Sequence, residues 1–388
     1  MNVPKLRFKE FNDNWKSYKL SDLVEFFKGN LLAKSDLDDN GKYPCILYGQ
    51  LYTKYKEVIR IIESKTNRDE KNIPRSKKGD VLIPSSGETP IDISTSSCIQ
   101  SDNVLLGGDI NILRPINCDG RFLSYTINNN KKTEIARVAQ GHSVVHLYID
   151  NLKYVSINVP SIKEQNKIAD ALELLDKKIE LQNKKIEDLK LFKKGLIEFE
   201  FSNSNYNEIN LKEILKERKT YSEKGLEFPH VTLSKDGIYD KTDRYNRDFL
   251  VKSDDKKYKI TYLNDLCYNP ANLKFGVICL NEYGSAIFSP IYVTFVIKNI
   301  ANPKYIKYYV KRNNFINAIR KYEQGTVYER MAVAPEDFLK FSIKLPNIEI
   351  QNKFVAKLLK LDKKIELENL KLSKYIKFKK GLMQNMFV

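Results

Sequence analysis

The seven-residue stretch LDKKIEL occupies positions 175–181 and returns unchanged at positions 361–367. An ungapped alignment of residues 160–201 with residues 346–387 brings two further identical blocks into register. These blocks are QNK, at 165–167 and 351–353, and FKKGL, at 192–196 and 378–382. Half of the paired positions are identical. Two unrelated lysine-rich helices would share only scattered matches, so we interpret the segments as two copies of one unit.

The offset between the copies, 186 residues, is nearly half of the 388-residue chain. Weaker similarities extend the repeat, because KLSDL at 19–23 resembles NLKEI at 210–214, and a Gln-Gly pair precedes each shared segment. Between these marks the copies scarcely match. The predicted organisation is therefore a variable domain (1–159), a shared helix (160–201), a second variable domain (202–345) and a second shared helix (346–388).

The shared segments predict long helices that pair through a heptad stripe of apolar residues. In each stripe one position is polar, Gln182 or Glu368, which costs stability but fixes register. The predicted seam residues are Ile168, Leu172, Leu175, Ile179, Gln182, Ile186, Leu189, Leu196, Phe354, Leu358, Leu361, Ile365, Glu368, Leu372, Tyr375 and Leu382.

Each helix, at roughly 35 residues, would measure about 50 Å. Two such helices can bury each other's stripe as an antiparallel pair; the alternative is that each helix packs only on its own domain. Pro160 and Pro346 mark the entries to the helices, and Gly195 and Gly381 are expected to cap their ends.

The variable domains indicate mixed α/β structure with more strand than helix. Strand-like runs separated by turn residues lie at 81–84, 103–106, 154–159, 277–280 and 291–297, and basic helices are expected at 123–138 and 303–322. The predicted fold class is α+β: two mixed α/β domains separated by two long antiparallel coiled-coil helices, with pseudo-two-fold symmetry.

The charge balance points to a polyanionic partner. Sixty-six Lys and Arg residues against 49 Asp and Glu give a formal charge of +17, and nucleic acid is the commonest partner of such a chain. A membrane surface is excluded as the partner because no apolar run approaches about 18 residues and no signal peptide opens the chain. Five cysteines without a C-x-x-C pair indicate reduced thiols in a cytoplasmic protein.

Motifs for catalysis or cofactor binding are missing from the sequence. There is neither a G-x-G-x-x-G nor a P-loop pattern. His142 and His146 have ligand-like spacing but no carboxylate cluster, and with His230 they are too few for a hydrolytic metal site. Asn269-Pro270-Ala271-Asn272 lacks the second proline and the aromatic residue of an adenine methyltransferase motif, so we interpret it as a turn. We therefore predict no catalytic residues and no metal site.

The order and repetition of these motifs resemble the specificity subunit of type I restriction-modification systems over essentially the whole chain. The opening segment PKLRF at 4–8 with Trp15, YPCILYGQLY at 43–52 and DLCYNP at 265–270 are similar to segments of that family. So is the pattern P-x-I-x-x-Q-x-K, which enters each shared helix. The connection at 202–206 is shorter than in many relatives.

The resemblance implies a DNA reader with a bipartite double-stranded target, in which each variable domain is a target-recognition domain. The helices would hold the domains at a fixed distance and bind two methyltransferase subunits, with restriction and translocation subunits added. S-adenosylmethionine, ATP and Mg²⁺ would be bound by those partners and not by this chain.

Two other readings stay open, a stand-alone sequence-specific or architectural DNA-binding protein and an enzyme with its own nuclease site. The candidate DNA-binding residues are Tyr48, Gln50, Tyr52, Ser85, Ser86, Arg114, Arg218, Arg244, Arg247, Asn272 and Lys274.

Overall fold

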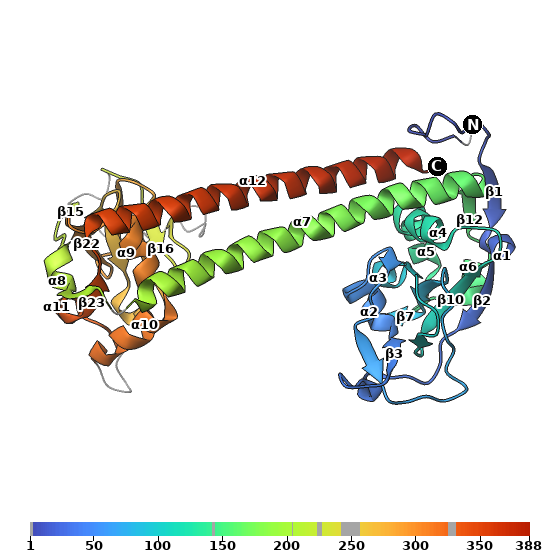
Figure 1. Ribbon diagram of the computed structural model, residues 1–388, viewed down its shortest axis with the longest axis horizontal. Helices are drawn as coiled ribbons and strands as arrows, with labels where there is room; N and C mark the ends of the chain where they lie inside the picture. The colour runs from blue at the N-terminus through green and yellow to red at the C-terminus, as the bar shows by residue number, and fades with distance from the viewer. Residues whose placement is uncertain (1–2, 142–143, 204, 223–226, 242–256, 325–330) are drawn as a thin grey trace. The chain divides into compact units, whose positions relative to one another are not determined.

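The computed structural model of the chain describes residues 3–141, 144–203, 205–222, 227–241, 257–324 and 331–388 (Figure 1). The chain falls into two compact units. Unit 1 comprises Met1–Lys184 and Asn369–Val388, and unit 2 comprises Lys185–Glu368. The predicted domain boundaries lie at helix ends, whereas the compact units divide inside the two shared helices. Each unit therefore contains one variable domain together with parts of both helices.

The two shared segments are single long helices, α7 (Ile162–Ser202) and α12 (Ile348–Met386). Within unit 1, Asp176 contacts Lys379 and Lys178 contacts Tyr375. Within unit 2, Lys185 contacts Glu368 and Lys193 contacts Asp362. In both units, residues later in α7 contact residues earlier in α12, so the two helices run antiparallel. The predicted fold class is therefore confirmed.

The expectation that Gly195 and Gly381 cap the helices is wrong. Both helices continue past their glycine, and neither residue has a positive φ. The surrounding residues are strong helix formers and the ends of the helices are packed, so the helix tolerates a glycine that costs about 1 kcal/mol relative to alanine.

In unit 1 the largest sheet has the order β2-β10-β6-β8-β4, and all its pairings are antiparallel except β4 with β8. Its strands are β2 (Val24–Lys28), β4 (Val58–Ile59), β6 (Val81–Pro84), β8 (Ser97–Ile99) and β10 (Ile110–Pro115). Smaller sheets pair β1 (Lys16–Lys19) with β12 (Ser156–Val159), β7 (Ser86–Gly87) with β11 (Val145–His146), and β3 (Tyr43–Ile46) with β5 (Ser64–Thr66) and β9 (Leu105–Leu106).

The short helices of unit 1 are α1 (Leu20–Leu23), η1 (Lys34–Asp36), α2 (Tyr48–Thr53), α3 (Pro90–Ile93), α4 (Gly120–Thr126), the π-helical turn η2 (Ile127–Lys131), α5 (Lys132–Val138) and α6 (Ile149–Leu152).

In unit 2 the largest sheet has the order β14-β22-β19-β20 and is antiparallel. Its strands are β14 (Leu215–Glu217), β19 (Leu266–Tyr268), β20 (Ile278–Leu280) and β22 (Val293–Ile297). Smaller sheets pair β13 (Asn207–Asn210) with β23 (Ser342–Leu345), β16 (Val231–Leu233) with β17 (Ile238–Asp240), and β15 (Tyr221–Ser222) with β18 (Tyr258–Thr261) and β21 (Ala286–Phe288).

The short helices of unit 2 are α8 (Leu211–Ile214), η3 (Pro270–Phe275), α9 (Pro303–Val310), α10 (Asn313–Ile319), η4 (Arg320–Tyr322) and α11 (Pro335–Lys340).

A common frame recurs in the two units although their sequences scarcely match. In each unit a two-stranded ladder, β1–β12 or β13–β23, contains a first strand that is followed by a one-turn helix, α1 or α8. The backbone amide of the first residue of this helix donates to the carbonyl of the residue just before the second strand of the ladder, β12 or β23. The order β2-β10-β6-β8 in unit 1 matches β14-β22-β19-β20 in unit 2. Each predicted strand run contains an observed strand, and the expected helices at 123–138 and 303–322 are present but broken into shorter pieces.

The core of each unit includes residues from both long helices. In unit 1, Ile168 and Leu172 of α7 and Met383 and Met386 of α12 are buried with the sheet residues of domain 1. In unit 2, Phe354 and Leu358 of α12 are buried in the core, and Leu196 and Phe201 of α7 pack against it. The alternative prediction, a helix that packs only on its own domain, is therefore wrong.

The opening segment is tied to the long helices of unit 1. The Arg7 guanidinium donates to both oxygens of Glu164 on α7, at 2.7 and 2.8 Å, and Trp15 Nε1 donates to the same carboxylate at 3.4 Å. The Leu6 amide donates to the Asn385 carbonyl on α12. Glu164 is almost fully buried, and its hydrogen bond raises the pKa of Arg7. A charge buried in this way needs its partner.

Candidate nucleic-acid interface

Two of the predicted DNA-binding arginines are bound to buried aspartates. In unit 1, Arg114 on β10 donates through Nε and Nη2 to the two oxygens of Asp80, both at 2.8 Å. Asp80 immediately precedes β6 and is 1% exposed. The guanidinium also lies over the Phe27 ring, 4.7 Å from its centre. The hydrogen bond to Asp80 raises the pKa of Arg114. A guanidinium has five N–H groups, so the Nη1 hydrogens and the second Nη2 hydrogen are not used by Asp80 and could reach a phosphate or a base.

Unit 2 builds a similar pair from a different strand. Arg218 follows β14 and donates through Nε and Nη2 to Asp265, at 2.8 and 2.9 Å, while it lies 4.7 Å from the centre of the Tyr262 ring. Asp265 precedes β19, the strand that matches β6. Both arginines thus have a fixed orientation, which is the arrangement that bidentate recognition requires.

The other candidates of domain 1 lie on or beside α2 and β7. Gln50 is buried and used internally, since Oε1 accepts from the Leu47 amide at 2.9 Å and Nε2 donates to Ser64 Oγ at 2.5 Å. Ser86 is buried in β7, and Ser85, just before it, is half-buried. Tyr48 and Tyr52 are half-buried, and burial raises the pKa of Tyr52. Within this group Tyr48, Tyr52 and Ser85 keep accessible surface, whereas Gln50 and Ser86 do not.

In domain 2 the candidates Asn272 and Lys274 lie on η3 and are exposed. Asn269 caps this helical turn, because its Oδ1 accepts from the Ala271 and Asn272 amides at 3.1 and 3.2 Å. The predicted turn at 269–272 is thus present. Lys274 Nζ lies 5.3 Å from the centre of the exposed Phe275 ring. An exposed cation beside an aromatic ring suits contact with a nucleic-acid backbone.

The predicted DNA-binding residues Arg244 and Arg247, and His142, lie outside the described residues. Across the ranges that the structure describes, no group of three or more His, Cys, Asp or Glu side chains is placed to hold a metal ion. In those same ranges, no helix is long and apolar enough to cross a membrane.

The cysteines do not provide a reactive thiol in the folded chain. Cys45, Cys98, Cys267 and Cys279 are buried and Cys118 is half-buried, and none forms a disulfide. Burial raises the pKa of Cys45 and of Cys279 to about 11. Thiols of this kind are largely protonated near neutral pH and are poor nucleophiles.

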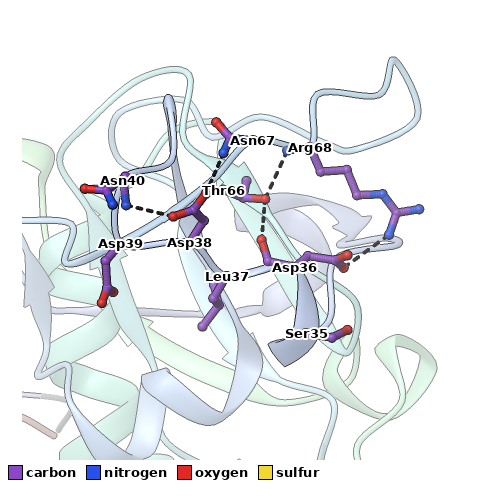
Figure 2. Close-up of a pocket in the computed structure, with 9 residues that line it drawn as sticks. All are labelled: Ser35, Asp36, Leu37, Asp38, Asp39, Asn40, Thr66, Asn67 and Arg68. Carbon is purple, nitrogen blue, oxygen red and sulfur yellow. Dashed lines mark hydrogen bonds and ion pairs between the residues drawn. The ribbon is translucent and has the colours of Figure 1, made fainter.

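A polar hollow on domain 1 has the wrong charge for a DNA backbone. Figure 2 shows Asp36, Asp38, Asp39 and Arg68 among the residues that line it, with the Arg68 side chain reaching Asp36. Arg68 Nη1 lies 3.1 Å from Asp36 Oδ2, and Asn67 Nδ2 donates to Asp38 Oδ2 at 2.6 Å. The pKa of Asp36 is lowered by its hydrogen bond from the Ala33 amide and by Arg68. Three carboxylates against one guanidinium repel phosphate, so this loop pair is not a candidate for backbone contact.

The predicted seam residues occupy the inner faces of α7 and α12. Those that are buried are Ile168, Leu172, Leu175, Ile179, Gln182, Ile186, Phe354, Leu358 and Glu368. Those that are half-buried are Leu189, Leu196, Leu361, Ile365, Leu372, Tyr375 and Leu382. Glu368 accepts from Lys185 at 2.9 Å. Four residues of the stripe, Ile168, Leu172, Phe354 and Leu358, belong to the hydrophobic cores of the two units.

The repeated blocks have a second role that the sequence reasoning missed. In unit 1, Asp176 of the first LDKKIEL block accepts from Tyr125 Oη at 2.7 Å and pairs with Lys379 Nζ of the second FKKGL block at 2.6 Å. In unit 2, Asp362 accepts from Tyr308 Oη at 3.2 Å and pairs with Lys193 Nζ at 2.5 Å. The same two blocks thus meet once in each unit, with exchanged roles.

The repeated glutamines add a matching pair of hydrogen bonds. Gln165 Oε1 accepts from the Asp119 amide at 3.0 Å, and its Nε2 donates to the Pro160 carbonyl at 2.9 Å. Gln351 does the same with the Asn302 amide at 2.8 Å and the Pro346 carbonyl at 2.8 Å. Asp119 and Asn302 are the N-caps of α4 and α9. Each glutamine therefore ties a long helix to the start of a helix in the variable domain.

We call these two sets joint 1 (Tyr125, Gln165, Asp176 and Lys379) and joint 2 (Tyr308, Gln351, Asp362 and Lys193). A signal for them was present in the sequence, since Gln, Asp and Lys recur at a constant offset. The tyrosines could not be paired in advance because they lie in the divergent domains.

The comparisons with known proteins agree with this architecture. Residues 12–191 match the family model described as the type I restriction modification DNA specificity domain. A protein described as a type I specificity subunit of Mycoplasma pneumoniae is 28% identical over 186 residues, which cover 48% of this chain and 44% of that protein. This match thus spans less than half of the relative's length. A protein so described from Mycoplasma genitalium is 23% identical and is matched over 99% of this chain and 96% of its own length.

The fold is that of a solved type I restriction-modification S subunit from M. genitalium. That structure superposes with a TM-score of 0.59 at 16% sequence identity, covering 100% of this chain and 99% of the other. Two unlike mixed α/β domains, two long helices with repeated blocks and these similarities lead to one assignment. Residues 12–191 match the type I restriction modification DNA specificity domain, and the whole chain has the fold of a type I restriction-modification S subunit.

Proposed function

We propose that the chain is the non-catalytic, sequence-specific DNA-binding subunit of a type I restriction-modification enzyme. Each variable domain reads one half of a bipartite double-stranded target. The helices α7 and α12 set the distance between the half-sites and bind two methyltransferase subunits, and restriction and translocation subunits complete the enzyme in the cytoplasm. S-adenosylmethionine, ATP and Mg²⁺ belong to those partners.

The observation that carries this proposal is the contrast between identical joints and divergent sheets. Joint 1 and joint 2 use the same residues at the same hydrogen-bonding positions. The arginines fixed by buried aspartates come from different strands, Arg114 from β10 and Arg218 from after β14. A constant attachment with a variable surface suits two reading heads with different target bases.

A second observation supports a partner on the helices. Leu181 and Leu367 are 58% and 50% exposed, and Phe192 and Phe378 are 58% and 59% exposed. These residues are identical in the two repeats but do not contribute to the buried core. Exposed apolar residues on a helix suit a protein partner, and their duplication supports two copies of the same partner.

The methylation pattern tests the DNA-recognition part. The chain would be produced with its methyltransferase in a host without other adenine methylation, and methylated adenines would be located in the genome. We expect a bipartite motif, and replacing residues 1–159 with the corresponding domain of another family member should change only one half of it. A change in both halves, or methylation that does not need this chain, would contradict the proposal.

Binding should also depend strongly on salt, because the charge of +17 favours contacts with phosphates. If 6 to 10 phosphates are contacted, affinity should fall by roughly 10³ to 10⁵ between 50 and 200 mM salt. A stand-alone DNA-binding protein would show the same salt dependence, so the discriminating result is whether the methyltransferase copurifies with the chain.

The spacing role can be tested without disturbing either joint. Deleting residues 182–188 together with 368–374 removes one heptad from each helix, between the Asp and Lys positions of the joints. This shortens the pair by about 10 Å, the length of about 3 base pairs. We expect the preferred spacer to shorten by that amount; an unchanged spacer with full affinity would rule out a spacing role.

A further inference from the structure

We propose that Lys193 and Lys379 are positioning residues for DNA recognition, each controlling the variable domain of the other repeat. Lys379, near the C-terminal end of the chain, would control the reading of the half-site bound by domain 1. Lys193, at the end of the first repeat, would control the half-site bound by domain 2. This inference rests on the proposed function and adds residues that act through Tyr125 and Tyr308.

The first step is that each joint holds its domain at two points of one helix. In unit 1, Gln165 binds the amide of Asp119, the N-cap of α4, and Asp176 binds Tyr125 six residues later. In unit 2, Gln351 binds the amide of Asn302, and Asp362 binds Tyr308, again six residues later. Two points about 9 Å apart along a helix fix its direction as well as its position.

The second step is that the lysine orients the acceptor. In joint 1, Lys379 Nζ lies 2.6 Å from Asp176 Oδ1, while Tyr125 donates to Oδ2 of the same carboxylate. Lys379 also donates to Glu57 of domain 1 at 3.2 Å, and its ammonium lies 5.4 Å from the centre of the Tyr125 ring. Hydrogen bonds with charged partners are shorter and stronger than neutral ones. Removing the ammonium would leave the carboxylate and the tyrosine without their shared restraint.

Joint 2 repeats this chemistry with the helices exchanged. Lys193 Nζ lies 2.5 Å from Asp362 Oδ1 and 5.1 Å from the centre of the Tyr308 ring. Burial first, and then the nearby carboxylate, raises the pKa of both Tyr125 and Tyr308. Both hydroxyls therefore stay protonated and can donate to the aspartate throughout the neutral range.

The third step separates positioning from folding. The attachment of domain 1 to the helices is also apolar, with Ile168, Leu172, Met383 and Met386 in its core and Phe387 stacked 5.5 Å from Phe122. In unit 2, Phe201 occupies the position of the first repeat that corresponds to Phe387 in the second. The centre of its ring lies 4.9 Å from the centre of the Tyr305 ring. These contacts would keep each domain folded and attached when a lysine is replaced. What is lost is the fixed direction of the domain, and recognition of bases depends on that direction.

The test replaces each lysine by an isosteric apolar residue in the full-length chain. K379M and K193M are compared with K380M and K194M, whose lysines are the exposed next neighbours. Affinity is measured for DNA carrying the bipartite target and for the same DNA with single base changes in either half. A domain 1 exchange assigns the half-sites beforehand.

We expect K379M to lower affinity by about tenfold and to weaken base discrimination only in the half-site of domain 1. K193M should do the same in the other half-site, K379R should retain discrimination, and the control variants should behave as wild type. Loss confined to the half-site nearer in sequence to the substituted lysine, or equal loss in both, would overturn the proposal.

Hydrogen exchange provides a readout that does not need DNA. K379M should increase amide exchange in α4 but not in α9, and K193M should do the reverse. Tyr125→Phe removes only the hydroxyl and should reproduce the K379M result if that variant folds poorly. If wild type shows no bipartite target, the proposed function fails; if wild type reads such a target but exchange in α4 is unchanged in K379M, the positioning role alone fails.

Discussion

The two joints and the two central sheets of this chain diverged to different degrees. Joint 1 and joint 2 are built from Gln, Asp, Lys and Tyr in equivalent positions and form the same hydrogen bonds. The sheets differ in strand number and in the source of the arginine that each buried aspartate binds. Each joint must keep a buried glutamine and partly buried charged groups hydrogen-bonded, whereas the rim of a sheet can change its residues without unfolding the domain.

The largest expected effect concerns the apolar residues by which the long helices pack against the two variable domains. Leu172 and Leu358 are repeat equivalents and both are fully buried. Leu172→Ala and Leu358→Ala should each lower the free energy of unfolding by about 3 kcal/mol, because each leaves a cavity in its own core. Denaturant unfolding measures this, with Leu174→Ala, at 70% exposure, as the control. A large difference between the two variants would show that the attachments are not equivalent.

The next test asks whether the two arginine–aspartate pairs, whose arginines come from different strands, contribute equally to stability. Asp80→Asn and Asp265→Asn each remove a charge that fixes a partly buried guanidinium. We expect a loss of about 2 kcal/mol in the free energy of unfolding in both cases. Arg114→Lys and Arg218→Lys keep the charge but lose the bidentate geometry, so comparing their DNA affinity with their stability separates base reading from a structural role.

A smaller and more symmetrical effect is expected at the glutamines. Gln165→Ala and Gln351→Ala each leave the amide of a helix N-cap residue without its acceptor. Each should cost about 1 to 2 kcal/mol of unfolding free energy, measured by thermal or denaturant unfolding. Gln→Glu keeps the acceptor oxygen but loses the donor to the proline carbonyl, and should fall between wild type and alanine if both bonds matter.

The smallest effect has the opposite sign. Gly195 and Gly381 lie inside α7 and α12, and an added Cβ would meet no atom within 4 Å. Gly195→Ala and Gly381→Ala should therefore stabilise the chain by about 0.5 to 1 kcal/mol. Gly195 follows Phe192 by three residues, on the same face of the helix. If these faces bind a methyltransferase at close range, the same substitutions should weaken its binding in a pull-down titration, whereas unchanged binding would place the partner elsewhere.

Several features could be predicted from residues alone. The offset of 186 residues revealed the duplication, and the heptad spacing indicated two long helices, which begin two residues after the predicted starts at 160 and 346 and are longer than the expected length of roughly 35 residues. Apolar runs such as 81–84 identified strands, because a run without alternation suits a strand covered on both faces. The buried state of Gln50 could not be predicted, since a polar residue beside tyrosines in a loop-like segment has the same appearance whether it reads a base or bonds to Ser64.

By itself, the sequence determined that the protein is a duplicated frame of long helices with two unlike domains and a strong positive charge. These properties depend on the spacing of residue types along the chain and on composition, and both can be determined from the sequence without knowing which residues are in contact. Only the tertiary structure decided that Lys379 meets Asp176 and Tyr125, and that Lys193 meets Asp362 and Tyr308. Such pairings join residues more than 50 positions apart, and their formation depends on the packing of helices and domains, to which no local pattern corresponds.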